Sequence, residues 1–273
     1  PEIYVFSGHM AGDTDMIHDL DLIPLLNSVE QLTRHFEALP GAPFGVQLDS
    51  GMNRLGLEPE EWAAVAEIAL GAGPAVLMSH LASADEPDSP QNAAQLRQFR
   101  EMTQGLGVAR SLAATGGTLL GPDYHFELTR PGVGLYGGLP FAEARPVVRL
   151  SLPVVQTRTV AAGESVGYNA TWTAEQDTVV ATVSGGYADG LKRALSGRAS
   201  LWCEGVPCPI LGRVSMDLIC CDISGLPGTP KALDMLCDEQ GVDVLAEQAG
   251  TIGYEVLTAL GGRYQRRYGA GAA

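Results

Sequence analysis

Lysine is nearly absent from this chain of 273 residues: Lys192 and Lys231 are the only two among 17 basic residues. Acidic residues number 32, the formal net charge is −15, and no run of five or more basic residues occurs. These features argue against nucleic acid and against an anionic membrane as partners. No apolar run reaches 18 residues, and the first residues lack a basic region followed by an apolar core, so we expect neither a membrane span nor a secretion signal.

Cysteine occurs in an odd number, five, and its spacing does not indicate a zinc site. Cys203 and Cys208 are spaced like a metal-binding pair, but no second pair with histidine follows at zinc spacing. Cys220 and Cys221 are adjacent in the chain. We therefore expect reduced, structural cysteines, no metal, and a cytoplasmic protein.

Apolar residues are plentiful at 45% of the chain, which is enough for a substantial core. Residues 1–142 repeat one pattern, in which a short apolar run and polar punctuation precede an apolar stripe of helical period. Helices are predicted to start at Ser28, Pro59 and Ser89-Pro90, the first of them with a capping box to Gln31. The apolar runs are 3–7, 22–28, 44–50, 75–82, 108–115 and 126–137. Strands that alternate with helices and are buried on both faces predict a parallel sheet.

A closed (β/α)8 barrel needs eight strands, and these runs supply six candidates. We therefore predict an α/β first domain, residues 1–142, that forms an open, incomplete TIM-type barrel without its first two units. After residue 143 alternating apolar and polar stretches dominate, with a hairpin turn at Glu204-Gly205 and one late helix after Thr251. Residues 143–273 are predicted to form a separate, mainly β domain.

Two charged side chains are predicted to lie just beyond the carboxyl ends of strands, which is the active-site face of a barrel. Arg54 stands in DSGMNRLG (49–56), and its guanidinium suits an anionic ligand group. A solvated loop arginine is the alternative. His80 stands in SHLASADEP (79–87). A lone histidine at a strand end is also compatible with a satisfied core group.

Arg130 lies inside the apolar run LTRPGVGLYG (128–137), where an unpaired charge is costly, so it needs an acceptor. Gly132 follows and leaves backbone N–H groups accessible, as a phosphate site requires. Thr115, Gly116 and Gly117 close the preceding strand with a hydroxyl and two flexible residues, which again suits a phosphate. Each of these glycine patterns is weak by itself.

Tyr168 stands in SVGYNATW (165–172), where a strand breaks, while GYADG (186–190) and GRVSMD (212–217) taken alone are ordinary strand-turn elements. Together with DSGMNRLG, SHLASADEP, AATGG and RPGVGLYG, these motifs strongly resemble bacterial alanine racemase. That family consists of pyridoxal-phosphate enzymes with an N-terminal barrel and a C-terminal β domain. The resemblance covers essentially the whole chain, and seven motifs in the family's order are far more specific than any one of them.

The resemblance implies the interconversion of L-alanine and D-alanine by a two-base mechanism, which supplies D-alanine for peptidoglycan. It also implies a homodimer in which each site is shared between subunits, because Tyr168 matches the catalytic tyrosine that acts in the partner subunit's barrel. Arg54 matches the arginine near the cofactor's phenolic oxygen and the substrate carboxylate. Arg130 matches the arginine facing the pyridine nitrogen, and His80 the histidine that links it toward the tyrosine. The implied phosphate-binding positions are Thr115, Gly132 and Val133.

Further residues match the substrate-binding part of the family's site. Met216 matches the residue whose backbone N–H meets the substrate carboxylate, and Tyr187 a tyrosine at the entrance. The implied entrance channel contains Asp85, Arg193 and Arg213. A tyrosine with a pKa near 10 is a poor base unless its neighbours stabilise the phenolate, which a His–Arg chain behind it can do.

The chain departs from the family pattern at its lysines. The family needs a lysine on the first barrel strand for the Schiff base and as the second base, and neither Lys192 nor Lys231 matches it. Gln47 stands where some relatives carry a carbamylated lysine that orients the arginine, and the resemblance implies that an uncharged amide does this here. We therefore expect an N-terminally truncated racemase that is inactive alone. The alternatives are a barrel decarboxylase of basic amino acids, against which Arg130 argues, and a non-catalytic remnant of the scaffold.

Overall fold

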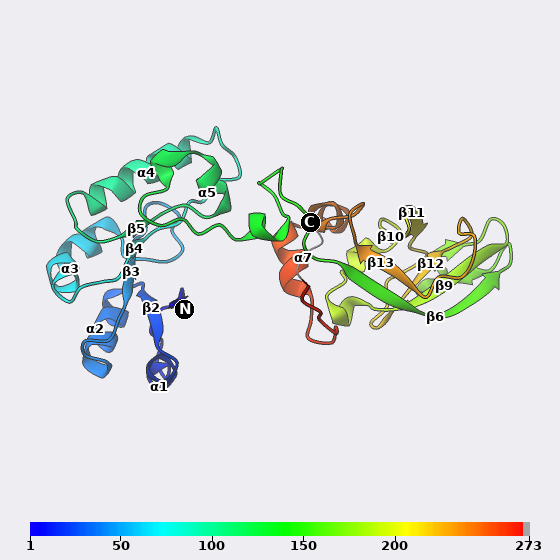
Figure 1. The fold of residues 1–273 in the computed structure, drawn as a ribbon, viewed down its shortest axis with the longest axis horizontal. Helices are drawn as coiled ribbons and strands as arrows, with labels where there is room; N and C mark the ends of the chain where they lie inside the picture. The colour runs from blue at the N-terminus through cyan, green and yellow to red at the C-terminus, as the bar shows by residue number, and fades with distance from the viewer. Residues whose placement is uncertain (270–273) are drawn as a thin grey trace. The chain divides into compact units, whose positions relative to one another are not determined.

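The chain divides into two compact units in the computed structural model, which describes residues 1–269. The first unit comprises residues 1–132 and the second begins at Val133 (Figure 1). The predicted boundary after residue 142 stays a prediction.

The first unit is an open parallel sheet with its helices on the outer side (Figure 1). The strands lie in the order β1-β2-β3-β4-β5, with every pair parallel, so β1 and β5 are the two edges. This arrangement confirms the incomplete barrel. The strands are β1 (Ile3–Val5), β2 (Leu22–Leu26), β3 (Gly45–Gln47), β4 (Leu77–Met78) and β5 (Arg110–Ser111). The helices are α1 (Thr14–Asp19), α2 (Val29–Ala38), α3 (Pro59–Gly71), α4 (Pro90–Thr103) and α5 (Thr115–Leu119).

The sixth predicted strand, residues 126–137, does not form. Its only ladder contact is an isolated parallel bridge between Ala114 and Arg130. Pro131 follows at once and has no N–H to extend the ladder, and a 3₁₀ turn begins at Val133. The run therefore ends the sheet after a single bridge.

The helix starts follow the predicted signals with one change. Ser28 caps α2 by accepting a hydrogen bond from the Gln31 backbone N–H at 3.2 Å. The Gln31 side chain does not complete the box, because its Oε1 accepts from the Asn27 backbone N–H instead, at 2.9 Å. Pro59 and Pro90 occupy the first positions of α3 and α4, as predicted.

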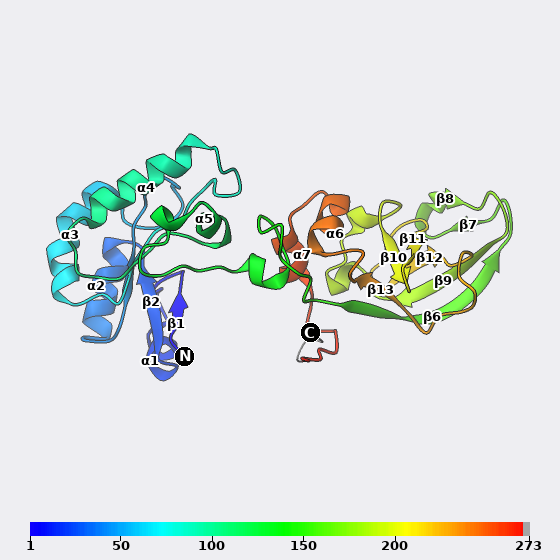
Figure 2. The same ribbon diagram turned by 45° about the horizontal axis from the view of Figure 1, so that its top comes forward.

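The second unit is mainly β, as predicted (Figure 2). Its six-stranded sheet has the order β11-β10-β13-β6-β9-β12 with antiparallel pairs, and β7 and β8 form a separate hairpin. Glu204 and Gly205 make the turn between β10 and β11, both with positive φ. The strands are β6 (Leu150–Val160), β7 (Ser165–Val166), β8 (Trp172–Thr173), β9 (Thr178–Ser184), β10 (Ser200–Cys203), β11 (Val206–Pro209), β12 (Leu218–Asp222) and β13 (Ala232–Leu236).

Two late helices form where one was predicted, α6 (Val242–Ala249) and α7 (Gly253–Ala259). Gly250 separates them in a left-handed conformation that glycine adopts readily. All five cysteines are free. Among residues 1–269, no helix combines the length and the apolarity needed to cross a membrane.

Candidate active site

Polar side chains gather where three neighbouring strands of the parallel sheet end. Asp49 and Ser50 follow β3, Ser79 and His80 follow β4, and Thr115 follows β5. The carboxyl ends of parallel strands meet at one edge of a sheet, so the sheet itself brings these residues together. The edge is the ligand-binding side expected of a barrel.

Arg130 lies at this edge and is held by four acceptors. Its Nη1 donates to the Ser111 hydroxyl, and its Nη2 donates to the carbonyls of Ser79 at 2.9 Å and Leu112 at 3.3 Å. The fourth acceptor is Nδ1 of His80, 3.2 Å from Nη2. Burial lowers the pKa of Arg130 to about 10, which leaves it charged at neutral pH. The sequence predicted that Arg130, inside an apolar run, needs an acceptor. These four groups supply it.

His80 is neutral and its tautomer follows from its partner. A guanidinium can only donate, so Nδ1 of His80 accepts and Nε2 carries the proton. Burial, followed by the charges of Arg130 and Arg54, lowers the pKa of His80 to about 4. The contribution of Arg54 places its charge close to the imidazole. The side chain is therefore not an isolated core histidine.

The loop that carries Arg54 is organised by Asp49. One carboxylate oxygen of Asp49 accepts the backbone N–H groups of residues 51, 52 and 53, at 2.8, 2.9 and 3.2 Å. Leu57 then returns to the end of β3 through an isolated parallel bridge with Leu48. Within residues 1–269 the Arg54 guanidinium makes no hydrogen bond, and it remains available to an anionic group.

Gln47 is buried at the base of the same loop. Its Nε2 lies 3.5 Å from the Leu55 carbonyl, and its Oε1 is one of the buried polar atoms without a partner in the described part of the chain. Its suggested role in orienting Arg54 stays a prediction.

Thr115 and Gly132 contact each other, and their role in binding a phosphate stays a prediction. The Gly132 backbone N–H donates to Oγ1 of Thr115 at 2.9 Å. The space beside Gly132 is open, because nothing lies within 4 Å of the position of a Cβ there. Val133 belongs to the second unit, where its side chain is buried, and its role stays a prediction.

In the second unit, segment 212–217 holds together the stretches that carry the predicted site residues. A Cβ on Gly212 would lie 2.5 Å from the carbonyl oxygen of Val166, so only glycine fits against the strand break that precedes Tyr168. Tyr168 itself is 67% exposed. The next two residues, Asn169 and Ala170, both have positive φ, at 63° and 46°. Non-glycine residues rarely adopt this conformation, and such strain concentrates at functional sites.

Tyr187 and Met216 lie side by side. The Tyr187 N–H donates to the Ser215 carbonyl and the Ala188 N–H to the Met216 carbonyl, both at 3.0 Å. A Cβ on Gly186 would lie 2.3 Å from these same carbonyl oxygens, so the close approach requires glycine. The Met216 N–H donates no hydrogen bond within residues 1–269, and the residue is 53% exposed.

The residues predicted for the entrance channel are divided between the two units, and their shared role stays a prediction. Arg213 belongs to segment 212–217, and the turn at Arg193 is tied to it because the Ser196 hydroxyl donates to the Arg193 carbonyl and accepts from Val214 N–H. Asp85 lies in the first unit, without a side-chain hydrogen bond in the described chain.

Several residues that support the site were not predicted from the sequence. Asp189 accepts the Gly186 N–H at 3.0 Å and pairs with Arg263, which also pairs with Asp217 at 2.7 Å. Asp189 lies in the GYADG motif, and the carboxylate in that motif could have identified it as a supporting residue. The serines at the sheet edge gave no signal, because a lone serine after a strand is common.

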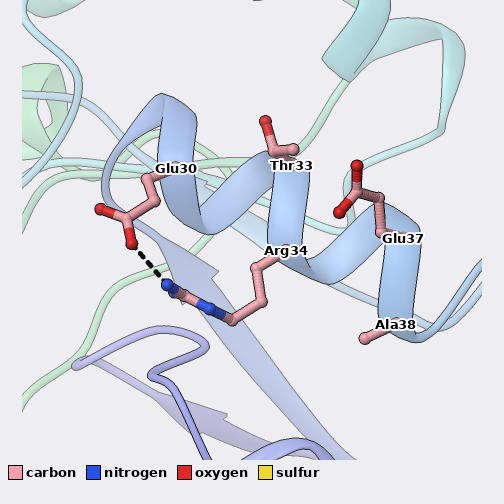
Figure 3. Close-up of a pocket in the computed structure, with 5 residues that line it drawn as sticks. All are labelled: Glu30, Thr33, Arg34, Glu37 and Ala38. Carbon is pink, nitrogen blue, oxygen red and sulfur yellow. Dashed lines mark hydrogen bonds and ion pairs between the residues drawn. The ribbon is translucent and has the colours of Figure 1, made fainter.

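Two hollows lie on surfaces outside the sheet edge. One, of about 510 Å³, lies over α2 and is lined by Glu30, Thr33, Arg34, Glu37 and Ala38; its only internal interaction is the 2.5 Å ion pair of Arg34 with Glu30 (Figure 3). The other, of about 990 Å³, is a groove of the second unit beside β7, and its lining includes Gly167 and Ser215. Only the second hollow adjoins predicted site residues.

The chain is similar to known proteins along its whole length. Residues 1–140 match the family described as "Alanine racemase, N-terminal domain", and residues 147–268 match "Alanine racemase, C-terminal domain". An alanine racemase of Cereibacter sphaeroides is 70% identical over 273 residues, which is 100% of this chain and 78% of that protein.

Solved structures agree with the sequence comparison. The crystal structure of alanine racemase from Bartonella henselae with covalently bound pyridoxal phosphate matches with a TM-score of 0.88 and 32% identity, over 98% of this chain and 79% of that one. The biosynthetic alanine racemase of Pseudomonas aeruginosa matches with a TM-score of 0.86 and 34% identity, over 98% and 79% of the two chains.

Proposed function

This chain belongs to the alanine racemase family, and we propose that it serves the interconversion of L-alanine and D-alanine with pyridoxal phosphate as cofactor. The observation that carries the proposal is the cluster of Arg130, His80 and Arg54 at the carboxyl edge of the parallel sheet. The decarboxylase alternative has no support among the relatives described above, which are all named alanine racemases.

The residues at the sheet edge fit pyridoxal phosphate. Nη1 and Nη2 of Arg130 are engaged, whereas its Nε makes no hydrogen bond within residues 1–269 and would be available to donate to the cofactor's ring nitrogen. Thr115 and Gly132 offer a hydroxyl beside open space for the phosphate. When bound, the cofactor supplies the electron sink that makes the substrate α-proton acidic. Arg130 can only donate, so a pyridine nitrogen held by it would have to accept the hydrogen bond and stay unprotonated, which would keep that sink weak.

Tyr168 is proposed to exchange the α-proton on one face of the substrate. Its exposure and the strained backbone of the next two residues, Asn169 and Ala170, suit a side chain that meets a ligand. Within the proposed homodimer it acts in the partner subunit's barrel, where His80 directs its Nε2–H away from Arg130. The Met216 N–H and Arg54 are proposed to hold the substrate carboxylate, with Tyr187 at the entrance.

The second base is proposed to be a lysine that these 273 residues do not supply. Both lysines belong to the second unit, and Lys192 is engaged in a 2.6 Å ion pair with Glu255. We expect borohydride treatment of residues 1–273 with pyridoxal phosphate to give no stoichiometric adduct at either lysine. Peptide mapping checks this. An adduct at Lys192 or Lys231 accompanied by racemisation overturns the lysine proposal.

The racemase proposal is tested in a lysine-completed protein, in which residues 1–273 are joined to the part of the Cereibacter sphaeroides relative that they do not match, where we expect the Schiff-base lysine to lie. We expect this protein to racemise alanine. Tyr168→Phe should slow α-deuterium exchange into L-alanine by about 10²–10⁴-fold and affect D-alanine less, because each enantiomer presents its α-hydrogen to a different base. Equal exchange rates in parent and variant, for both enantiomers, would show that Tyr168 is only a packing residue.

The same proposal assigns the product D-alanine to peptidoglycan synthesis and the enzyme to the cytoplasm. The family resemblance supports the first assignment, and the five free cysteines support the second.

A further inference from the structure

Gln95 is a buried amide on α4 whose hydrogen bonds all reach the two loops that carry Arg54 and His80. Gln95 is only 1% exposed. Oε1 accepts the Ala82 backbone N–H at 2.8 Å, and Nε2 donates to the His80 carbonyl at 2.9 Å and lies 3.4 Å from the Ser50 hydroxyl. A buried amide is costly unless its atoms are paired, and here both ends are paired.

The contacts to His80 and Ala82 clamp the main chain on both sides of Leu81. An amide donates and accepts at once, so one side chain fixes a carbonyl and an N–H two residues apart. The backbone of His80 fixes the point from which its imidazole reaches Arg130. The direction of the Nδ1 lone pair toward Arg130 therefore depends on this clamp.

The contact to Ser50 reaches the other side of the same cluster. The Ser50 and Ser79 hydroxyls lie 2.7 Å apart, and the Ser79 carbonyl accepts Nη2 of Arg130 at 2.9 Å. Gln95 thus supports both partners of the His80–Arg130 hydrogen bond, through the His80 carbonyl directly and through Ser50 and Ser79 on the Arg130 side.

We propose that Gln95 is a positioning residue that sets the imidazole of His80 against the guanidinium of Arg130, an inference about the reaction that rests on the proposed function. Packing does not account for its position, because Leu96 and Phe99 supply the apolar contacts of α4 to the core. Gln91, one turn earlier, also fastens these loops, through the Gly51 carbonyl and the Ser83 hydroxyl, but it does not touch His80. Gln91 is exposed, so it is a control for the loss of loop contacts that do not reach His80.

The first experiment measures the His80 imidazole by ¹⁵N NMR in residues 1–273 without cofactor, with the signal assigned by His80→Gln. The unchanged chain should show the Nε2–H tautomer alone and a pKa near 4. Gln95→Met keeps the side-chain volume and removes the clamp. We expect it to populate the Nδ1–H tautomer and to raise the pKa of His80 measurably, because water enters and the Arg130 contact loosens. Gln91→Met should leave both the tautomer and the pKa unchanged.

Gln95→Glu is a second variant, which keeps the proposal testable if Gln95→Met does not fold. It keeps the acceptor for the Ala82 N–H and places a second acceptor opposite the His80 carbonyl. A nearby negative charge alone raises the His80 pKa but keeps the tautomer, so a shift to Nδ1–H in this variant reports lost positioning. An unchanged tautomer in both folded Gln95 variants overturns the proposal.

Racemisation by the lysine-completed protein separates this proposal from the proposed function. Gln95→Met should lower kcat by about 10²-fold with a much smaller change in KM, since misplacement acts on the reacting groups rather than on binding. If the completed protein does not racemise alanine while the NMR result holds, the function is wrong and the positioning stands. If the completed protein is active and kcat is unchanged in Gln95→Met, the positioning role in the reaction is wrong.

Discussion

Hydrogen-bond geometry determines the tautomers of His9 and His35, the two buried histidines of the first unit, as it does for the partly buried His80. Nε2 of His35 faces the Ala42 carbonyl at 3.3 Å and must donate, so its Nδ1 accepts from Nδ1–H of His9 at 3.2 Å. Nε2 of His9 then accepts from the Thr14 hydroxyl at 2.9 Å. Burial is the largest cause that lowers the pKa of both rings, as it is for His80. All three are neutral at pH 7.

This neutrality makes the first unit sensitive to mild acid. His80 has a folded-state pKa of about 4 against 6.5 for the free side chain, so the unfolded chain binds more protons between these values. Its contribution to stability is therefore full above pH 6.5 and is lost as the pH drops toward 4, by about 1.4 kcal/mol for each pH unit in that interval. His9 and His35 act with the same sign.

His80→Gln should remove the largest part of this loss. Urea unfolding at pH 7.5 and pH 5, followed by Trp62 fluorescence with Trp172 and Trp202 replaced by Phe, measures it in the first unit. The unchanged chain should lose more stability than the variant between the two pH values. Equal losses would show that His80 is not neutral in the folded state.

Elements with strong periodicity were predictable from the sequence, whereas single contacts at the sheet edge were not. Five of the six apolar runs form the parallel strands, and in the central three, β2 to β4, burial on both faces leaves a continuous apolar signal. The run that contains Arg130 does not form a strand, because Pro131 interrupts the ladder. The apolar face of α4 was predictable, but the contacts of Gln95 were not. Apolar periodicity says nothing about a polar residue whose side chain points into loops.

The loop after β3 gives a prediction at the scale of the element. Gly56 has φ of +109°, and a Cβ there would lie 2.8 Å from the Asp49 nitrogen. Gly56→Ala should therefore cost more than the ~1 kcal/mol of a left-handed alanine, and it should displace Arg54. Gly73→Ala is the control, because its φ is +76° and nothing lies within 4 Å of its Cβ. Urea unfolding measures the difference; equal costs would show that the loop relaxes around the added methyl.

The two units divide the proposed catalytic residues between them. Arg54, His80 and Arg130 lie in the first unit, and Tyr168 and Met216 in the second. Each half is organised internally, the first by the sheet edge and the second by segment 212–217. The sequence motifs identified both halves but carry no information about which chain completes a site, since that depends on the assembly of folded units.

Mixing two inactive variants of the lysine-completed protein tests whether sites are shared between subunits. Arg54→Ala damages the first unit at an exposed side chain without hydrogen bonds in the described chain, and Tyr168→Phe damages the second. In a symmetric dimer with shared sites, each hybrid has one site with both lesions and one with neither. When equal amounts are mixed, random exchange makes half of the dimers hybrid. One of the two sites in each hybrid is intact, so about one quarter of all sites should regain full activity. The variants are co-refolded and assayed for racemisation. A mixture of Arg54→Ala with Thr115→Ala, both in the first unit, should regain nothing because every site keeps a lesion. If the first mixture also stays inactive although hybrids form, each site is built from one chain, and Tyr168 serves the barrel of its own subunit.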